Sequence, residues 1–392
     1  MWRREFARHS AMLAVAAIVV AMVAAPASSD DSDSILKKLK NINVITATVP
    51  GNGDINPYGI VQVKHTVGKL LRGHILISNF NNMANQQGTG TTIVDVAPDG
   101  TLSTFAQIDP TKLPGPCPGG VGLTTALTVL RTGWVIVGSL PTTDGTSATA
   151  QSGCLLVLDN SGNVVETLTD DSINGPWDMT SSDNDREAHL FVTNVLNGTV
   201  AAGGDVVNEG TVLRIDLHVS MAQMPKIESI TVIGSGFSER TDPAALVIGP
   251  TGVGLSPACE DEDDGREGDD CANRNSERVL YVADSLNNRI AAIPNALRRT
   301  HSAGTGHTLF AGGSLNDPLG LTVAPNGHIL VVNGDDGFIT EIGRHGKQLA
   351  TVLLDNTGGP PPGNGTLFGV TFDPERGVLF VDDGSNTLNS LN

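Results

Sequence analysis

From about residue 43 to residue 392, short apolar runs alternate with polar gaps rich in Gly, Asn and Asp. Runs of about five residues bounded by such gaps predict short β-strands and tight turns rather than helices. One phrase recurs along this pattern: a Pro/Gly turn, a strand, a polar gap, and then an apolar strand ending in a small polar or acidic residue. Six copies of that apolar strand occur, at 75–79, 135–139, 190–194, 280–284, 329–333 and 379–383.

Each copy has one candidate strand before it and, where the chain continues far enough, two after it. Four strands in each of six units are typical of an all-β, six-bladed β-propeller. The last unit lacks its outer strand, whereas residues 43–49 form a spare strand before the first unit. We therefore predict that residues 43–49 complete the last blade and close the ring, which removes the two open sheet edges. A pair of β-sandwiches or a β-helix would not explain this complementary arrangement.

The polar residues that end the apolar strands recur in five of the six copies, as Asn79, Asn194, Asp284, Asn333 and Asp383. A side chain that caps a turn is needed in every repeat, whereas a catalytic residue is needed once. We therefore interpret these five residues as structural.

Two of the repeats resemble a known family. Residues 279–290 (VLYVADSLNNRI) resemble the signature of the NHL repeat, and residues 317–333 resemble its opening half. The resemblance implies an NHL-type propeller over residues 42–392, although the other four copies are degenerate.

The N-terminus has the composition of a targeting segment. Arg3, Arg4 and Arg8 precede an unbroken apolar run at 11–25, and small residues surround a candidate cleavage site near Ala27. This predicts a signal peptide over 1–27 followed by a linker at 28–41, and a secreted or periplasmic protein that leaves the membrane after cleavage. An uncleaved anchor is the alternative, but the run is short for a membrane span, which needs about 20 residues.

The formal net charge is −18. A strongly acidic surface repels phosphate backbones, so nucleic-acid binding is not expected. Four cysteines in an exported chain favour disulfides over free thiols. Of the three possible pairings, proximity in the sequence favours Cys117–Cys154 and Cys259–Cys271.

An acidic insertion interrupts the fourth blade at 259–271, between Cys259 and Cys271. Dense carboxylates suit a hard cation such as Ca²⁺, which takes six to eight oxygen ligands. Ca²⁺ is accordingly the candidate cofactor, and a solvated acidic loop is the alternative. The candidate metal ligands are Asp261, Asp263, Asp264 and Asp269.

Turns before the first strands of blades 1, 3 and 5 share an Asn and a Pro. In a propeller these strands line the central channel, so their polar side chains are candidates for binding a ligand or an ion there. They equally well begin turns, as Asn and Asp commonly do. The candidates are Asn56, Asn174, Asp178, Asn316 and Asp317.

This arrangement resembles the propeller lactonases of the SMP-30/gluconolactonase kind. That resemblance implies one divalent metal held in the channel by Glu, Asn and Asp, but the first blade here has no Glu at the corresponding position. Two functions follow: a binding module for an unidentified small molecule or protein outside the cytoplasm, or a divalent-metal hydrolase acting through the channel. Propellers support both, so fold alone does not decide between them. We expect a monomer in either case.

Overall fold

The computed structural model describes residues 33–258 and 277–392. The predicted signal peptide at 1–27 lies outside the described residues. So does the acidic insertion, with Cys259, Cys271, Asp261, Asp263, Asp264 and Asp269.

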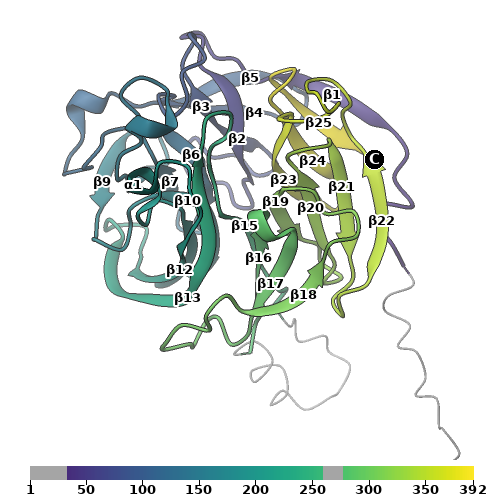
Figure 1. Ribbon diagram of the computed structural model, residues 1–392. Helices are drawn as coiled ribbons and strands as arrows, with labels where there is room; N and C mark the ends of the chain where they lie inside the picture. Colours follow the sequence, from purple (N-terminus) through teal and green to yellow (C-terminus); the bar gives the residue numbers. More distant parts are fainter. Residues whose placement is uncertain (1–32, 259–276) are drawn as a thin grey trace, which may run out of the picture.

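Six antiparallel sheets form the molecule, and they confirm the predicted six-bladed β-propeller (Figure 1). Blade 1 contains β2 (Ile55–Gln62), β3 (Ile75–Asn81), β4 (Thr92–Val96) and β5 (Leu102–Gln107). Blade 2 contains β6 (Leu123–Val129), β7 (Val135–Ser139), β8 (Cys154–Leu158) and β9 (Val164–Leu168). Blade 3 contains β10 (Pro176–Asp183), β11 (Glu187–Asn194), β12 (Val207–His218), β13 (Lys226–Asp242) and β14 (Leu246–Ile248).

The remaining blades have four strands each. Blade 4 contains β15 (Pro250–Leu255), β16 (Leu280–Asp284), β17 (Arg289–Ile293) and β18 (His307–Ala311). Blade 5 contains β19 (Pro318–Val323), β20 (Ile329–Asn333), β21 (Phe338–Ile342) and β22 (Gln348–Leu353). Blade 6 contains β23 (Leu367–Asp373), β24 (Gly377–Asp382), β25 (Thr387–Leu391) and β1 (Ile42–Ala47). Helical structure in the described chain is limited to α1 (Thr199–Ala202) and single 3₁₀ turns at Pro110–Lys112, Ser147–Thr149 and Ser285–Asn287.

The ring closes as the sequence predicts. Strand β1 pairs antiparallel with β25, from Ile42 opposite Leu391 to Ala47 opposite Thr387 (Figure 1). The inner strands β2, β6, β10, β15, β19 and β23 contact one another in a closed cycle around the middle. Pairing β1 with β25 gives blade 6 its fourth, outer strand and joins the N-terminal and C-terminal parts of the described chain in one sheet.

Blade 3 departs from the expected four strands. Its fourth strand, β13, is 17 residues long and continues into a hairpin with β14, where Asp242 lies opposite Leu246. Leu246 and Val247 are buried in an aromatic cluster at the centre of the ring. The four-strand prediction fails here because the repeat phrase does not distinguish a long β-ribbon from a strand of ordinary length.

The hydrophobic core lies between the blades. Each neighbouring pair of blades shares one buried apolar cluster, and six such clusters complete the ring. The second strand of every blade is covered on both faces, and in blade 2 the third strand is as well; β3, β7 and β8 are buried along their whole length. This burial explains why such strands are mostly apolar in the sequence.

The segment at 33–40, expected to be a linker, packs against blades 5 and 6. Leu36 is 1% exposed and joins the cluster between these two blades. The buried carboxylate of Glu341 accepts hydrogen bonds from Ser34 Oγ (2.5 Å) and from the backbone N–H groups of Ile35 and Leu36 (2.9 Å each), and it pairs with His328 Nδ1 (2.7 Å). The segment therefore extends the ring closure beyond β1.

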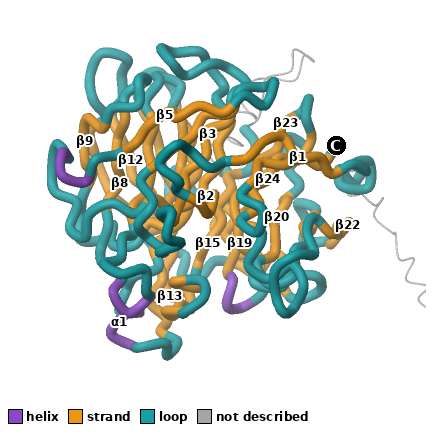
Figure 2. Tube along the Cα trace, turned by 90° about the horizontal axis from the view of Figure 1, so that it is seen from above, coloured by secondary structure: helices purple, strands orange, loops and turns teal. Residues whose placement is uncertain are grey.

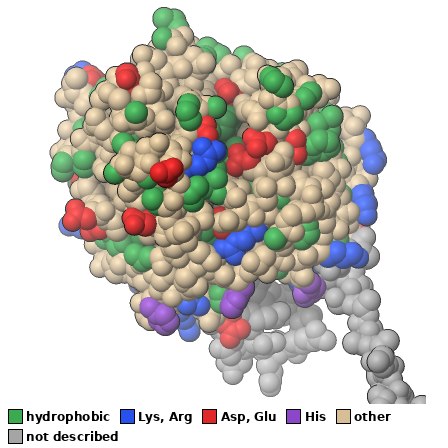
Figure 3. Space-filling view, in the orientation of Figure 1, with side chains coloured by type: hydrophobic (Ala, Val, Ile, Leu, Met, Phe, Trp, Pro, Cys, Tyr) green, Lys and Arg blue, Asp and Glu red, His purple; other side chains and the backbone are tan. Residues whose placement is uncertain are grey.

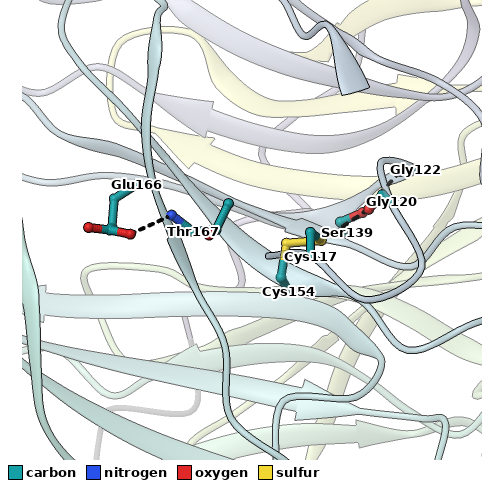
Figure 4. Close-up of a disulfide and its surroundings, with 7 residues drawn as sticks. All are labelled: Cys117, Gly120, Gly122, Ser139, Cys154, Glu166 and Thr167. Atoms are coloured by element: carbon teal, nitrogen blue, oxygen red, sulfur yellow. Dashed lines mark hydrogen bonds between the residues drawn. A yellow bond between two sulfur atoms is a disulfide. The ribbon is translucent and has the colours of Figure 1, made fainter. Parts of the chain in front are cut away.

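The predicted Cys117–Cys154 disulfide is present, with 5.3 Å between the two Cα atoms (Figure 4). It ties the loop before β6 to the first residue of β8. Cys154 is buried, and Cys117 packs against the cluster between blades 1 and 2. The bond thus links the approach to blade 2 with its third strand.

We expect Leu36→Ala to destabilise the protein by about 2–5 kcal/mol, because it removes a fully buried side chain and leaves a cavity. Urea unfolding would measure the effect. Leu71→Ala is the matched control: Leu71 is 44% exposed, and its loss should change the free energy of unfolding by no more than about 0.5 kcal/mol. Equal effects of the two substitutions would show that the N-terminal segment contributes nothing to ring closure.

Candidate functional site

A cavity of about 700 Å³ occupies the central channel and is lined by all six inner strands. Three of these strands, β2, β15 and β19, lie near the centre in the view from above (Figure 2). A cavity of this volume is within the usual range of small-molecule sites in proteins, about 300–1,000 Å³. The channel is therefore the candidate site.

The two ends of the channel differ. At the end where the inner strands begin, the cavity is lined by Tyr58, Trp177 and Phe368. Tyr58 stacks on Phe368 with ring centroids 4.0 Å apart and meets Trp177 edge-on at 5.9 Å. At the opposite end, where the inner strands finish, the lining includes exposed residues such as Lys64 and His65, so the cavity opens to solvent there.

All six inner strands carry a β-bulge near their start. The residue before the bulge pairs with a residue at or near the end of the second strand, as Pro57 does with Asn79 and Pro176 with Asn194. The second residue after this pair is Gly in four blades. A Cβ at each of these glycines would collide with a carbonyl oxygen of the next inner strand, so the close approach of neighbouring strands requires glycine. These glycines are Gly59, Gly252, Gly320 and Gly369.

Asp178 occupies this position in blade 3. Its Oδ2 accepts a hydrogen bond from the N–H of Val253 in the next inner strand (3.0 Å), and its Oδ1 accepts one from Met179 N–H (2.8 Å). The residue lines the cavity and is partly exposed. Burial raises the pKa of Asp178 to about 7, against the lowering effect of its two hydrogen bonds. At neutral pH this carboxyl can therefore both accept and donate a proton.

Asn56 and Asp317 occupy equivalent places, one residue before the inner strand's proline in blades 1 and 5. Both adopt left-handed backbone conformations, with φ of 63° and 53°. Each backbone N–H donates to an Asn side-chain oxygen, from Asn386 and Asn288 respectively, at 2.7 Å in both cases. This shared geometry is structural, because an Asn or Asp tolerates the left-handed conformation better than most residues do.

The backbone N–H groups of these two residues are hydrogen-bonded, but their side chains lie in less favourable surroundings. Asn56 is 4% exposed, and its Oδ1 has no hydrogen-bond partner in the described part of the chain. Burial raises the pKa of Asp317 to about 7, and the nearby charges of Asp335 and Asp242 act in the same direction while Arg240 opposes them. On the face drawn in Figure 3, acidic side chains gather beside a basic one near the middle of the molecule.

Tyr58 lies near Asn56 and Asp317 and also near Asp383 of blade 6. Burial raises the pKa of Tyr58 well above its usual range, and the charges of Asp383 and Asp317 add to the effect. Burial, with the charge of Asp382, raises the pKa of Asp383 to about 7. Tyr58 therefore lies near the side chains of Asn56, Asp317 and Asp383, which come from three blades; of these four residues, Tyr58 and Asp317 line the cavity.

The structure does not bring all five candidate residues together. Asp178 and Asp317 line the cavity, whereas Asn56, Asn174 and Asn316 do not. The Nδ2 of Asn174 donates to Asn197 Oδ1 (2.6 Å) within its own blade. Within residues 33–258 and 277–392, no group of three or more His, Cys, Asp or Glu side chains is placed to hold a metal ion.

Sequence reasoning missed Tyr58, the contribution of Asp383, and the basic residues around the open mouth of the channel. Asp178 was a candidate because of its turn, but the stronger signal is that it replaces a repeated glycine. That signal becomes visible only when the six inner strands are aligned on their bulges, one of which, in blade 2, contains an additional residue.

In the described part of the chain, no helix is both long and apolar enough to cross a membrane. Fold and site together define a six-bladed propeller with a polar central cavity. No family model matches the sequence, and no curated protein matches it. The resemblance to NHL repeats therefore stays a prediction.

Solved structures with a similar fold include a gluconolactonase from Xanthomonas campestris and a putative gluconolactonase. The first is 13% identical, covers 89% of this chain and 88% of its own, and has a TM-score of 0.51. The second is 15% identical, covers 89% of this chain and 91% of its own, and has a TM-score of 0.50. At these identities the likeness supports the propeller fold alone.

The raised pKa of Asp178 predicts a specific pH dependence of stability. Between its ordinary value of about 4 and about 7, the folded protein binds a proton at Asp178 more strongly than the unfolded chain does. Stability from this group is therefore lost as the pH rises through that window. We expect wild type to lose stability relative to Asp178→Asn between pH 5 and pH 8 in urea unfolding.

The control for this measurement is Asp171→Asn, which changes an exposed carboxylate in the loop between β9 and β10. Its difference from wild type should be the same at both pH values. A constant difference for Asp178→Asn as well would show that the channel does not perturb the Asp178 carboxyl.

Proposed function

We propose that this protein is an exported propeller, of the NHL type, that binds a small organic molecule in its central channel. The observation that carries the proposal is the 700 Å³ cavity, which has an aromatic inner end, hydroxyl-bearing walls and an open mouth. Thr125, Thr180, Ser181, Thr322 and Thr371 contribute hydroxyl groups to the walls. Such a surface suits a ligand that combines an apolar part with several hydrogen-bonding groups.

Two further observations support export. The basic and apolar N-terminus has the pattern of a cleaved signal. The Cys117–Cys154 disulfide is of the kind that persists in oxidising compartments. The net charge of −18 makes nucleic acid a poor partner.

Hydrolysis of a lactone or ester is the second candidate function, and Asp178 is the observation that favours it. A carboxyl with a pKa of about 7, facing a cavity, can take a proton from an attacking water and return it to the leaving oxygen. The similar structures described as gluconolactonases give the reaction class. A role in hydrolysis would also explain why this group occurs in a single blade.

A divalent cation such as Ca²⁺ belongs to this second candidate. The strand-start end offers oxygen donors of the type that Ca²⁺ prefers: the unpaired Oδ1 of Asn56 and the carboxylates of Asp317 and Asp383. When bound there, a cation would polarise the carbonyl of a lactone or ester. The carboxylates at 260–270 are a separate candidate for the same ion.

The hydrolytic candidate predicts that Asp178→Asn lowers the rate of lactone or ester hydrolysis by roughly 10²–10⁴-fold, the usual contribution of a general acid or base. The measurement is turnover of a panel of small lactones and aryl esters by the purified mature protein, with Asp171→Asn as the control. If no member of the panel is hydrolysed but one of them raises the melting temperature, binding without hydrolysis is supported. Full activity in Asp178→Asn would exclude the assigned role of this residue.

The cation candidate predicts that Ca²⁺ raises the melting temperature, because an ion that binds only the folded state stabilises it. Asp317→Asn should abolish the increase, and deletion of residues 260–270 should leave it intact. The reverse pattern would assign the ion to the acidic insertion. Unchanged melting at millimolar Ca²⁺ in wild type would contradict both sites.

A further inference from the structure

The open mouth of the channel is basic although the protein as a whole is strongly acidic. Lys64, His65, Arg131 and Arg278 line the cavity at this end. They come from three blades: Lys64 and His65 follow β2, Arg131 follows β6, and Arg278 precedes β16. With a net charge of −18, a convergence of cationic side chains around one opening is not explained by the overall composition.

Arg278 is the most informative of these residues because it is largely buried. Its Nε donates to the carbonyl oxygen of Ser256 (2.6 Å) and its Nη1 donates to Ser182 Oγ (3.1 Å). Within the described ranges it forms no ion pair with a carboxylate. Burial lowers the pKa of Arg278 to about 10, so the guanidinium remains charged at neutral pH. A partly buried guanidinium with neutral partners retains donors for an anion.

One carboxylate, Asp183, belongs to the same mouth. Its Oδ2 accepts a hydrogen bond from the backbone N–H of Arg131 (2.6 Å), and burial raises its pKa. The nearby Asp373 is already paired with Arg376 Nε (2.7 Å) and with Gln62 Nε2 (2.7 Å). Among the residues that the structure describes, the cavity lining at the mouth therefore holds three cations (Lys64, Arg131 and Arg278), one histidine and one carboxylate, Asp183.

We propose that this mouth binds the anionic end of the channel's ligand, so that the ligand is a small organic anion. The inference rests on the proposed function, since it names the class of molecule that the channel takes. Ser182, which contacts Arg278, lies four positions after Asp178 on β10; at about 3.3 Å per position the two lie roughly 13 Å apart. A ligand anchored at the mouth would thus direct its uncharged end along the hydroxyl-bearing walls toward Asp178.

A matched pair of fluorescent probes tests the proposal on the full mature chain. The two probes are 8-anilinonaphthalene-1-sulfonate and N-phenyl-1-naphthylamine, which share a ring system and differ by the sulfonate. We expect the sulfonate probe to bind more tightly than the neutral one despite the acidic protein. Arg278→Gln should weaken the sulfonate probe roughly tenfold or more, the value of a hydrogen bond to a charged group, and leave the neutral probe unchanged.

Arg131→Gln is a second variant, for the case in which Arg278→Gln does not fold. The Arg131 side chain is exposed, and the hydrogen bond from its backbone N–H to Asp183 is kept. This variant should weaken the sulfonate probe selectively, by about threefold, as expected for a partly screened charge. The matched control is Lys347→Gln, which removes an exposed cation from the outer hairpin between β21 and β22 and should have no effect.

The outcomes are distinguishable. Equal binding of the two probes, or equal losses in Arg278→Gln, Arg131→Gln and Lys347→Gln, would overturn the anion site while leaving the channel as a binding cavity. If neither probe binds and no small molecule changes the melting temperature, both the anion site and the proposed function are wrong.

Discussion

The close approach of six inner strands around one axis is the constraint on which the rest of the structure depends. In four blades the backbone of the inner strand lies against a carbonyl oxygen of the next, and a Cβ at the point of contact would collide with it. Glycine, which has no Cβ, occupies this point in four blades. A β-bulge at the same level bends each of these strands. Pairing of β1 with β25 and docking of Leu36 hold the ring closed.

Four other blades have glycine at the position of Asp178. Its place in a turn therefore does not explain why blade 3 has a carboxylate there. A carboxylate at a glycine position must either bridge the two strands or face the channel, and Asp178 does both, since one oxygen accepts from Val253 N–H while the side chain lines the cavity. A purely structural bridge would not need an ionisable group; Thr125 makes the corresponding contact in blade 2 with a hydroxyl donated to the carbonyl of Trp177. The choice of a buried acid over a hydroxyl has an energetic cost, which points to a use for its proton.

The sequence predicted the fold well because the repeat is a physical requirement repeated six times. The six blades, closure by residues 43–49 and the Cys117–Cys154 pair all follow from the spacing of apolar strands and cysteines. The site was harder to predict, because its residues are those that depart from the repeat and come from different blades. Lys64, Arg131 and Arg278 are ordinary loop residues in the sequence, and only the ring places them around one opening. The β13–β14 hairpin was not predicted either, because it occurs in blade 3 and is not part of the repeat.

The two ends of the channel impose opposite electrostatic demands on one ligand. The strand-start end is aromatic and lined by the carboxyl group of Asp317, which disfavours a negatively charged group there. The mouth is basic and favours an anion. The net negative charge of the protein repels anions at long range. The basic residues of the mouth therefore attract an anion only within one Debye length, about 8 Å at physiological salt. A single molecule that satisfies both ends is anionic at one end and uncharged at the other, so charge sets its direction in the channel and brings its neutral end to Asp178.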